Sequence, residues 1–395
     1  DKACGDGLTP RAVEEMRRLG LGDWLSTRPT NLGLRASGFG RTWHMPWPGG
    51  SLPDTGSAAA RYELDAAIFD VARRAGATAR TGLRIASVTH DAQGRITDVT
   101  GREGSSTVTI HPRRVVVADG ARSTFSRELG RVWHRDTVYG VAARAYVDSA
   151  RADDPWISSH LELRDAEGDV LSGYGWVFPL GGGRLNLGVG TLATEARPAN
   201  VNLNKLLHRY FDLRREDWQL TGTPQSVRSA LLPMGGAVSG VAGPNWALVG
   251  DAAGCVNPLN GEGIDYGLET GRLAAELLVD SADHPGAVDL TTAWSAELNR
   301  RYALASDAPD QLVGWIRDLQ SVDTDGMSNP LWECNGVCTG RVSWALDNYE
   351  REATLAHEVA HNFGLRHVNT TGSCDANNDD GSDWPYTSPT IQETG

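Results

Sequence analysis

Apolar residues recur with a helical period in four segments of the first part of the chain. Thr9 to Leu21 opens with Thr-Pro, which suits a helix cap and first turn, and Tyr62 to Ala75 ends at Gly76, as many helices do. Residues 262–279 and 291–304 have the same three-to-four-residue apolar spacing. These four segments are predicted to be helices.

Strand-like patterns lie between these helices. Residues 85–99 alternate around a turn at 91–94, which predicts a hairpin. Two short apolar runs, 114–118 and 246–249, predict buried strands that end in tight turns. A mostly antiparallel sheet is predicted over residues 140–150, 158–165, 171–179 and 184–193. The pattern therefore predicts an α/β (α+β) fold with a mixed sheet and a separate antiparallel sheet.

The pattern changes near residues 310–320, where we predict a domain boundary. Residues 318–343 show no sustained period and predict loops, and residues 372–395 are rich in Asp, Asn and Gly and predict further loops. Residues 350–363 predict a helix. Arg341 to Leu346 fits either an edge strand that pairs with substrate or a plain amphipathic strand.

Charge and hydropathy exclude two classes of partner. The 395-residue chain has a formal net charge of −13, which argues against a nucleic-acid partner because phosphate binding needs a basic surface. No apolar run approaches the roughly 20 residues that span a bilayer, so we expect no transmembrane segment.

Several short motifs in the first part suit a nucleotide-like cofactor. Glycines in Cys4-Gly5-Asp6-Gly7 let the backbone approach a planar ligand. Asp251, after the predicted strand at 246–249, can accept hydrogen bonds from ribityl or ribose hydroxyls. A helix start preceded by glycines, near 261–263, favours an anion, and Arg61 at another helix start suits a phosphate. Each motif alone is more often a plain turn.

The order and spacing of these motifs resemble the FAD-dependent geranylgeranyl reductase family, a branch of the aromatic-hydroxylase-like flavoproteins. The resemblance covers about residues 1–310 and implies an FAD-binding domain over 1–135 and 240–310, with a substrate domain over 136–239. It implies that Cys4 lies beside the flavin ring as a catalytic residue. The cofactor-binding residues that it implies are Cys4, Gly5, Asp6, Gly7, Arg61, Asp119, Gly120, Gly250, Asp251, Gly261 and Gly263.

A further family feature, P-x-x-Y-x-W-x-F-P, lines the isoprenoid site. This chain has Leu171 in place of the first proline, and the matching residues are Tyr174, Trp176, Phe178 and Pro179. The resemblance implies reduction of a C=C bond in a prenyl-chain lipid, with NAD(P)H or another donor as reductant, at a cytoplasmic or peripheral-membrane location. The alternative is a strand that carries aromatic residues on one face without a ligand.

One expected unit of that family is missing from this sequence. No G-x-G-x-x-G lies between a predicted strand and helix, and Gly181-Gly182-Gly183 lies between two strand-like runs. We therefore expect a chain truncated at its N-terminus, with weak or absent FAD binding.

The last part carries the string H-E-x-x-H-x-x-G-x-x-H. His357 and His361 are four residues apart, so they share one helix face, and Gly364 permits the turn that brings His367 round as the third Zn²⁺ ligand. Glu358 suits the general base that acts on a zinc-bound water. The string resembles the metzincin metalloproteases over about residues 318–395, within a predicted segment 311–395, and implies a peptide substrate and secretion. The alternative is a surface helix with incidental histidines.

The main prediction is thus an FAD-dependent reductase that carries a zinc-protease motif, in a chimeric or truncated chain. A zinc metalloendopeptidase is the first alternative. The second is a non-catalytic remnant that binds a prenyl lipid or a protein partner through its aromatic sheet. The sequence does not fix the oligomeric state.

Overall fold

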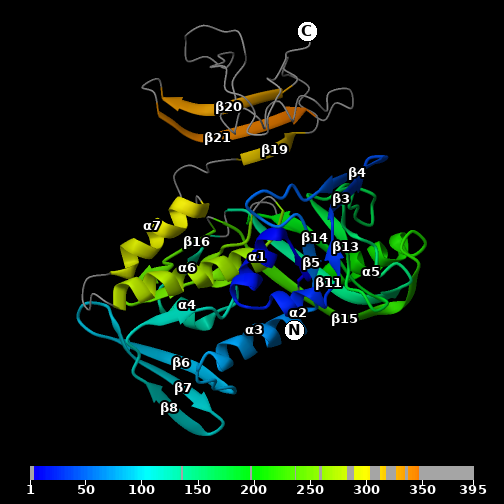
Figure 1. Cartoon of the computed structure of the whole chain (residues 1–395). Coiled ribbons are helices and arrows are strands. Elements are labelled where there is room, and N and C mark those ends of the chain that lie inside the picture. The colour runs from blue at the N-terminus through cyan, green and yellow to red at the C-terminus, as the bar shows by residue number, and fades with distance from the viewer. Residues whose placement is uncertain are drawn as a thin grey trace. The chain divides into compact units, whose positions relative to one another are not determined.

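The computed structural model describes residues 4–134, 137–195, 198–235, 237–257, 260–282, 289–302, 312–316, 326–333 and 337–346. The chain divides into two compact units, Asp1–Tyr302 and Ala303–Gly395, which Figure 1 traces from blue to orange.

A seven-stranded mixed sheet is the main sheet of the first unit. Neighbouring strands within this sheet run antiparallel, except that β12 and β3 run parallel. In sheet order its strands are β15 (Leu220–Pro233), β11 (Tyr139–Ser149), β14 (Arg184–Ala193), β13 (Gly173–Pro179), β12 (Trp156–His160), β3 (Gly33–Gly38) and β4 (Arg41–Pro46). The four predicted antiparallel strands are confirmed as β11 to β14, whereas β15 and the β3–β4 hairpin were not predicted.

The two faces of this sheet differ because side chains alternate along each strand. On one face, α5 (Leu203–Arg214) packs against a core that contains Val177, Leu187 and Val189, and we call this the α5 face. Asn202 caps α5, since its side chain accepts a hydrogen bond from the backbone N–H of Lys205 at 3.1 Å. The other face carries Tyr174, Trp176 and Phe178, and we call it the aromatic face.

A second, smaller sheet contains the two short apolar runs. β18 (Trp246–Leu248) lies between β17 (Ala242–Gly243) and β9 (Val115–Val117), and β18 and β9 run parallel. The predicted strands are thus confirmed, as are the helices α6 (Ile264–Ala282) and α7 (Leu290–Tyr302). The fully buried Trp294 of α7 donates its indole N–H to the carbonyl of Leu248 at 2.8 Å, which ties α7 to β18.

The predicted hairpin is confirmed as β6 (Leu83–His90) and β7 (Ile96–Glu103), to which β8 (Ser106–Ile110) adds a third strand. It follows the predicted helix α3 (Arg61–Arg74) in the chain (Figure 1). The remaining elements of the unit are β1 (Gly7–Leu8), α1 (Pro10–Arg18), α2 (Gly22–Ser26), β2 (Thr30–Asn31), β5 (Gly56–Ala58), α4 (Thr124–Glu128), β10 (Val132–Trp133), β16 (Val238–Ser239) and η1 (Gly250–Ala253).

An ion pair joins the first helix to α6 across a long stretch of sequence. The buried carboxylate of Glu15 in α1 accepts hydrogen bonds from Nε and Nη2 of Arg272 in α6, at 2.8 and 2.9 Å. Thr9 precedes α1 as predicted, but its hydroxyl donates to Asp265 at 3.4 Å instead of capping the helix. Met16 of α1 is buried in the same region. Early and late parts of the chain therefore complete one core.

The described part of the second unit is a three-stranded sheet of β19 (Leu312–Ile316), β21 (Val337–Leu346) and β20 (Gly326–Glu333), in that order. The prediction of loops over residues 318–343 is wrong where it covers β20 and β21. Their Gly, Ser, Asn and Cys residues hid the strand period, and pairing stabilises them. Residues 341–346 lie in the central strand and not at an edge. The predicted helix at 350–363 and the loops at 372–395 lie outside the described residues.

No described helix combines the length and the apolar character needed to cross a bilayer.

Candidate functional site

The glycine-rich loop at Cys4–Gly7 lies on the aromatic face of the large sheet. A Cβ on Gly5 would stand 2.6 Å from Cε2 of Phe178, so only glycine fits this approach. Asn186 donates its side-chain N–H to the carbonyl of Cys4 at 2.7 Å and accepts the indole N–H of Trp176 at 2.9 Å. The structure thus brings together two sets of predicted residues, the cofactor loop and the aromatic row.

The indole of Trp176 packs closely on the neighbouring strand because that strand supplies a glycine. Gly188 of β14 pairs with Trp176, and a Cβ there would stand 2.1 Å from Cζ2 of the indole. Tyr174, Trp176 and Phe178 share this face by alternation. Pro179, predicted to line the same site, follows Phe178 directly and therefore lies on the α5 face.

Tyr174 connects the aromatic face to the loop before α6. Its hydroxyl donates a hydrogen bond to the carbonyl of Asn260 at 2.5 Å. A Cβ on Gly261 would lie 3.5 Å from the hydroxyl oxygen of Tyr174. Burial, together with the charges of Glu262 and Cys4, raises the pKa of Tyr174 to about 12. Gly261 therefore lies close to a neutral tyrosine hydroxyl.

Asp6 is a fully buried carboxylate within the loop. Its backbone has φ +63°, and neither carboxylate oxygen has a hydrogen bond of normal geometry within the described residues. Burial raises the pKa of Asp6 to about 6, although nearby Asn186, Tyr146 and Arg144 act to lower it. The site therefore holds a carboxylate whose burial is only partly compensated.

Cys4 and Arg61 interact at the edge of this loop. Burial raises the pKa of the Cys4 thiol more than the positive charge of Arg61 lowers it, so the thiol is neutral at pH 7. Arg61 begins α3 as predicted, but its guanidinium donates to Asp65, at 3.0 Å from Nε and 2.8 Å from Nη2. The phosphate contact predicted for Arg61 therefore competes with this ion pair.

Two acidic side chains come together at the start of α6. Burial and, to a lesser degree, the nearby Asp265 raise the pKa of Glu262 to about 8. Burial also raises the pKa of Asp265, against the lowering effect of the Tyr266 backbone N–H. The pair therefore holds a proton at neutral pH beside the loop that Tyr174 contacts.

The other predicted cofactor residues gather where two parallel strands end. Asp119 and Gly120 follow β9 and Gly250 and Asp251 follow β18, so these turns share one edge of the small sheet. A Cβ on Gly263 would lie 3.7 Å from Oδ1 of Asp251, which places the start of α6 there as well.

A buried arginine that was not predicted lies beside these turns. Burial lowers the pKa of Arg131, while the charges of Asp119 and Asp251 oppose that shift. Its Nη1 donates to the carbonyl of Ala121 at 2.9 Å, whereas Nε and Nη2 have no hydrogen-bond partner in the described parts of the chain. Two buried donors beside the N-terminus of α6 suit an anionic group such as a phosphate.

The predicted zinc ligands His357, His361 and His367, and the predicted base Glu358, lie outside the described residues. Within the described residues, no three His, Cys, Asp or Glu side chains gather into a metal site.

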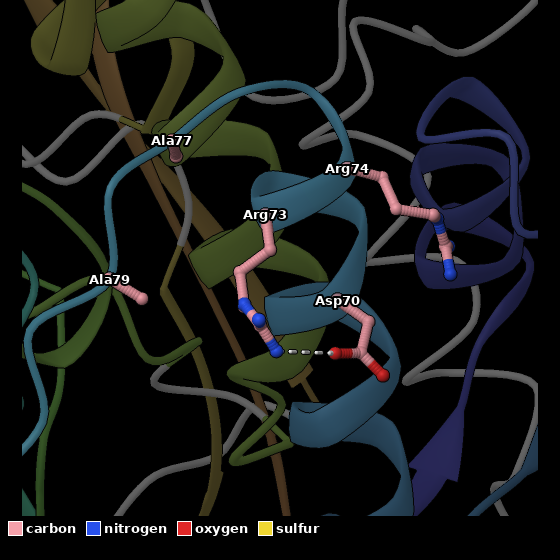
Figure 2. Close-up of a pocket in the computed structure, with 5 residues that line it drawn as sticks. All are labelled: Asp70, Arg73, Arg74, Ala77 and Ala79. Atoms are coloured by element: carbon pink, nitrogen blue, oxygen red, sulfur yellow. Dashed lines mark ion pairs between the residues drawn. The ribbon is translucent and has the colours of Figure 1, made fainter.

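Two surface hollows lie apart from the predicted residues. One, of about 590 Å³, is lined by Asp70, Arg73, Arg74, Ala77 and Ala79 at the end of α3. Figure 2 shows Arg73 directed at Asp70, with which it pairs at 4.0 Å, while Arg74 extends away. The other, of about 480 Å³, is lined by Ser26, Thr27, Arg28, Pro29, Thr30, Asp153, Asp154, Leu180, Gly181 and Gly182. Neither hollow contains a residue of the predicted sites.

Some of the residues that were missed have a partial signal in the sequence. Asn186 and Arg144 each interrupt an apolar strand at a position that alternation assigns to one face, which indicates a polar group beside a site. Arg131 and the pair Glu262 and Asp265 have no such local signal, because only the tertiary fold buries them.

Comparison with known proteins gives the family. Residues 2–232 match the FAD binding domain family. The chain is 59% identical over 303 residues to a menaquinone reductase of Mycolicibacterium smegmatis, which covers 77% of this chain and 72% of the relative. It is 28% identical over 360 residues to digeranylgeranylglycerophospholipid reductase 1 of Methanopyrus kandleri, which covers 84% of this chain and 89% of the relative.

A solved structure shows the same fold. A geranylgeranyl bacteriochlorophyll reductase-like protein of Thermoplasma acidophilum aligns with a TM-score of 0.62 at 19% identity, over 75% of this chain and 73% of that one. The resemblance to geranylgeranyl reductases is confirmed at the level of the family, and these matches do not bear on the zinc motif. The chain belongs to the FAD binding domain family, among FAD-dependent reductases of mixed α/β fold.

Proposed function

We propose that this chain carries the reductase site of an enzyme that hydrogenates a C=C bond in the prenyl tail of a menaquinone. The observation that carries the proposal is the 59% identity to a menaquinone reductase. A second relative, which is named for a digeranylgeranyl lipid, supports a prenyl chain as the reacting part. The aromatic face offers an apolar wall of the kind that such a chain needs.

The described residues fit part of the FAD cofactor. The Cys4–Gly7 loop packs on Phe178 of the aromatic face, beside the wall proposed for the substrate, and Asp251 and the buried Nε and Nη2 of Arg131 suit ribityl and phosphate groups. No G-x-G-x-x-G is present in this sequence to hold the pyrophosphate. When bound, FAD supplies the hydride for the reduction.

The chain's own residues would then position the tail and hold the second hydrogen as a proton. Trp176 and Phe178 exclude water from the apolar chain, and the hydrogen bond of Trp176 to Asn186 fixes the indole. Saturation of a C=C bond also consumes one proton. The neutral thiol of Cys4 holds a proton next to this wall, and the pair of Glu262 and Asp265 holds another. NAD(P)H or another donor is proposed as the source of electrons.

The test separates tail reduction from reduction of the quinone ring. The full chain is supplied with FAD, reduced with dithionite, and incubated with menaquinone in detergent. After reoxidation in air, tail reduction leaves a quinone absorption spectrum and a mass gain of about two hydrogens, whereas ring reduction leaves the starting mass. We expect the mass gain, its loss in Cys4→Ala, and its retention in Leu213→Ala on α5. Ring reduction alone would overturn the proposal.

A second candidate function rests on the complete zinc motif at residues 357–367. For this segment we propose a zinc metalloendopeptidase site with His357, His361 and His367 as ligands and Glu358 as base. Elemental analysis should find about one Zn²⁺ per chain, and His361→Ala should remove it. A chain that retains neither zinc nor flavin would instead favour the non-catalytic lipid- or partner-binding remnant.

A further inference from the structure

The far edge of the large sheet exposes an apolar patch. The terminal strand β4 is exposed at every residue, and Trp43 and Met45 are each 44% exposed. Phe39 in the β3–β4 turn and Leu161 after β12 are similarly exposed. We call these four residues the edge patch. Large apolar side chains scattered singly are ordinary on a protein surface, but four at one sheet edge indicate an interaction surface.

Two residues of the edge patch, Trp43 and Met45, lie on the same sheet face as the aromatic row. Strand register pairs Trp176 with Ser159, Ser159 with Ala36, and Ala36 with Trp43. Residues that pair directly project to one face of a sheet. Trp43 therefore lies on the aromatic face, three strands along the sheet from Trp176.

A second row of paired residues, with larger apolar side chains, also runs across the sheet to the edge strand β4. Ile157 pairs with Leu34, and Leu34 pairs with Met45. Ile157 is two residues from Ser159 in β12, so this row lies on the aromatic face too. Buried Ala36 and Ile157 fill the interval between the aromatic row and the edge. From β12 outward this part of the face is thus mostly apolar, and it ends in exposed Trp43 and Met45.

Charge around the edge patch is compatible with a lipid surface. No Asp or Glu occurs between Asp23 and Asp54, in a chain whose 50 acidic residues average about one in eight. Glu162, beside the β3–β4 turn, accepts the backbone N–H of Phe39 at 2.8 Å and pairs with Arg164 at 2.5 Å. Arg35 on β3 is likewise paired, with Asp154 at 3.1 Å. Apolar insertion, and not attraction between charges, would therefore drive docking.

We propose that the edge patch docks on the surface of a lipid bilayer, so that the aromatic face receives its substrate from the membrane. The proposal rests on the proposed function, since a menaquinone tail resides in a bilayer. Trp43 suits the interface because its indole has an apolar body and one polar N–H. Met45, Phe39 and Leu161 would insert beside it.

The test is flotation of the full chain with phosphatidylcholine vesicles that contain no substrate. The double variant Trp43→Ser/Met45→Ser should reduce the partition coefficient by about tenfold or more, because each side chain loses its transfer into an apolar phase. The matched control is Leu213→Ser, which removes a leucine that is 55% exposed on α5. It should bind like the unaltered chain. Raising salt from about 0.05 to about 0.5 M should leave binding unchanged.

Three results would overturn the proposal. The unaltered chain does not float, the double variant floats as well as the control, or the edge patch instead joins two copies of the chain. In the last case sedimentation finds a dimer that the double variant dissociates. Binding needs neither flavin nor turnover, so a chain that floats through the patch but reduces nothing contradicts the proposed function alone. A chain that hydrogenates menaquinone in detergent but never floats contradicts the docking proposal alone.

Discussion

The two faces of the seven-stranded sheet are built from the same strands and differ in almost every other respect. The α5 face buries Val177, Leu187 and Val189 in a hydrophobic cluster against a helix. The aromatic face buries Arg144 and Asn186 at alternating positions of the same strands. Because side chains alternate along each strand, one face can form a hydrophobic core with α5 while the other carries the candidate site.

The aromatic face carries an energetic cost because it buries charged groups. Asp6 and Arg144 are both fully buried, and buried charges cost free energy unless their partners compensate them. Arg144 donates to the carbonyl of Ser226 at 2.6 Å, whereas burial still dominates the pKa of Asp6. This cost is of the kind that functional sites retain.

The largest effect is expected from the α5 face. Leu187→Ala removes a side chain with no exposed surface and leaves a cavity. It should lower the free energy of unfolding by about 2–5 kcal/mol, measured by urea denaturation, with reductase activity per folded molecule retained. Leu213→Ala, at an exposed position of α5, should change stability by less than about 0.5 kcal/mol. A Leu187→Ala loss no larger than that of the control would contradict the assignment of the core.

Asp6→Asn tests the free-energy cost of burying a carboxylate on the aromatic face, through the pH dependence of stability. The pKa of Asp6 rises from an ordinary 3.8 to about 6 on folding. The folded state then binds more protons, so the stability that this group contributes is present below pH 3.8 and is lost as pH rises through 6. The loss is on the order of 3 kcal/mol, and Asn should abolish it. Denaturation at pH 4 and pH 8 measures the difference, and parallel profiles for the two proteins would refute the prediction.

Gly188→Ala tests the close approach of sheet and indole. The added methyl would meet Trp176 at 2.1 Å and must displace the ring from Asn186. We expect a loss of about 1–3 kcal/mol and an altered near-ultraviolet circular dichroism spectrum. Gly190→Ala is the matched control, because its methyl would stand at an ordinary 3.5 Å from Trp176. Equal losses in both variants would argue against a specific clash.

The smallest effect is expected from Tyr174→Phe, which deletes only the hydroxyl that binds the carbonyl of Asn260. Thermal denaturation should show a loss of about 1 kcal/mol, as for one hydrogen bond. Tyr62→Phe, at an exposed position of α3, provides the control and should change little. A Tyr174→Phe protein as stable as this control would mean that the hydroxyl does not hold the loop before α6.

The sequence predicted the parts of the fold that have a local period. Strands β11 to β14 were readable because Leu187 and Val189, among others, alternate with small or polar residues. The edge strand β4 was not, because all its residues are exposed and no face of Arg41–Pro46 is buried enough to set a pattern. The cofactor loop at Cys4–Gly7 was predicted from its glycines. Its packing on Phe178 and its hydrogen bond from Asn186 were not predicted, because these contacts join residues far apart in the chain.

The ion pair between Glu15 and Arg272 constrains when the first helix can complete its folding during synthesis. The partners are 257 residues apart. At a synthesis rate of about 5–20 residues per second, α6 follows α1 from the ribosome after on the order of ten seconds to a minute. During that interval Met16 and the buried carboxylate of Glu15 lack the surface that covers them in the finished chain. The segment from Cys4 to Met16 therefore reaches its native environment only after α6 has been synthesised.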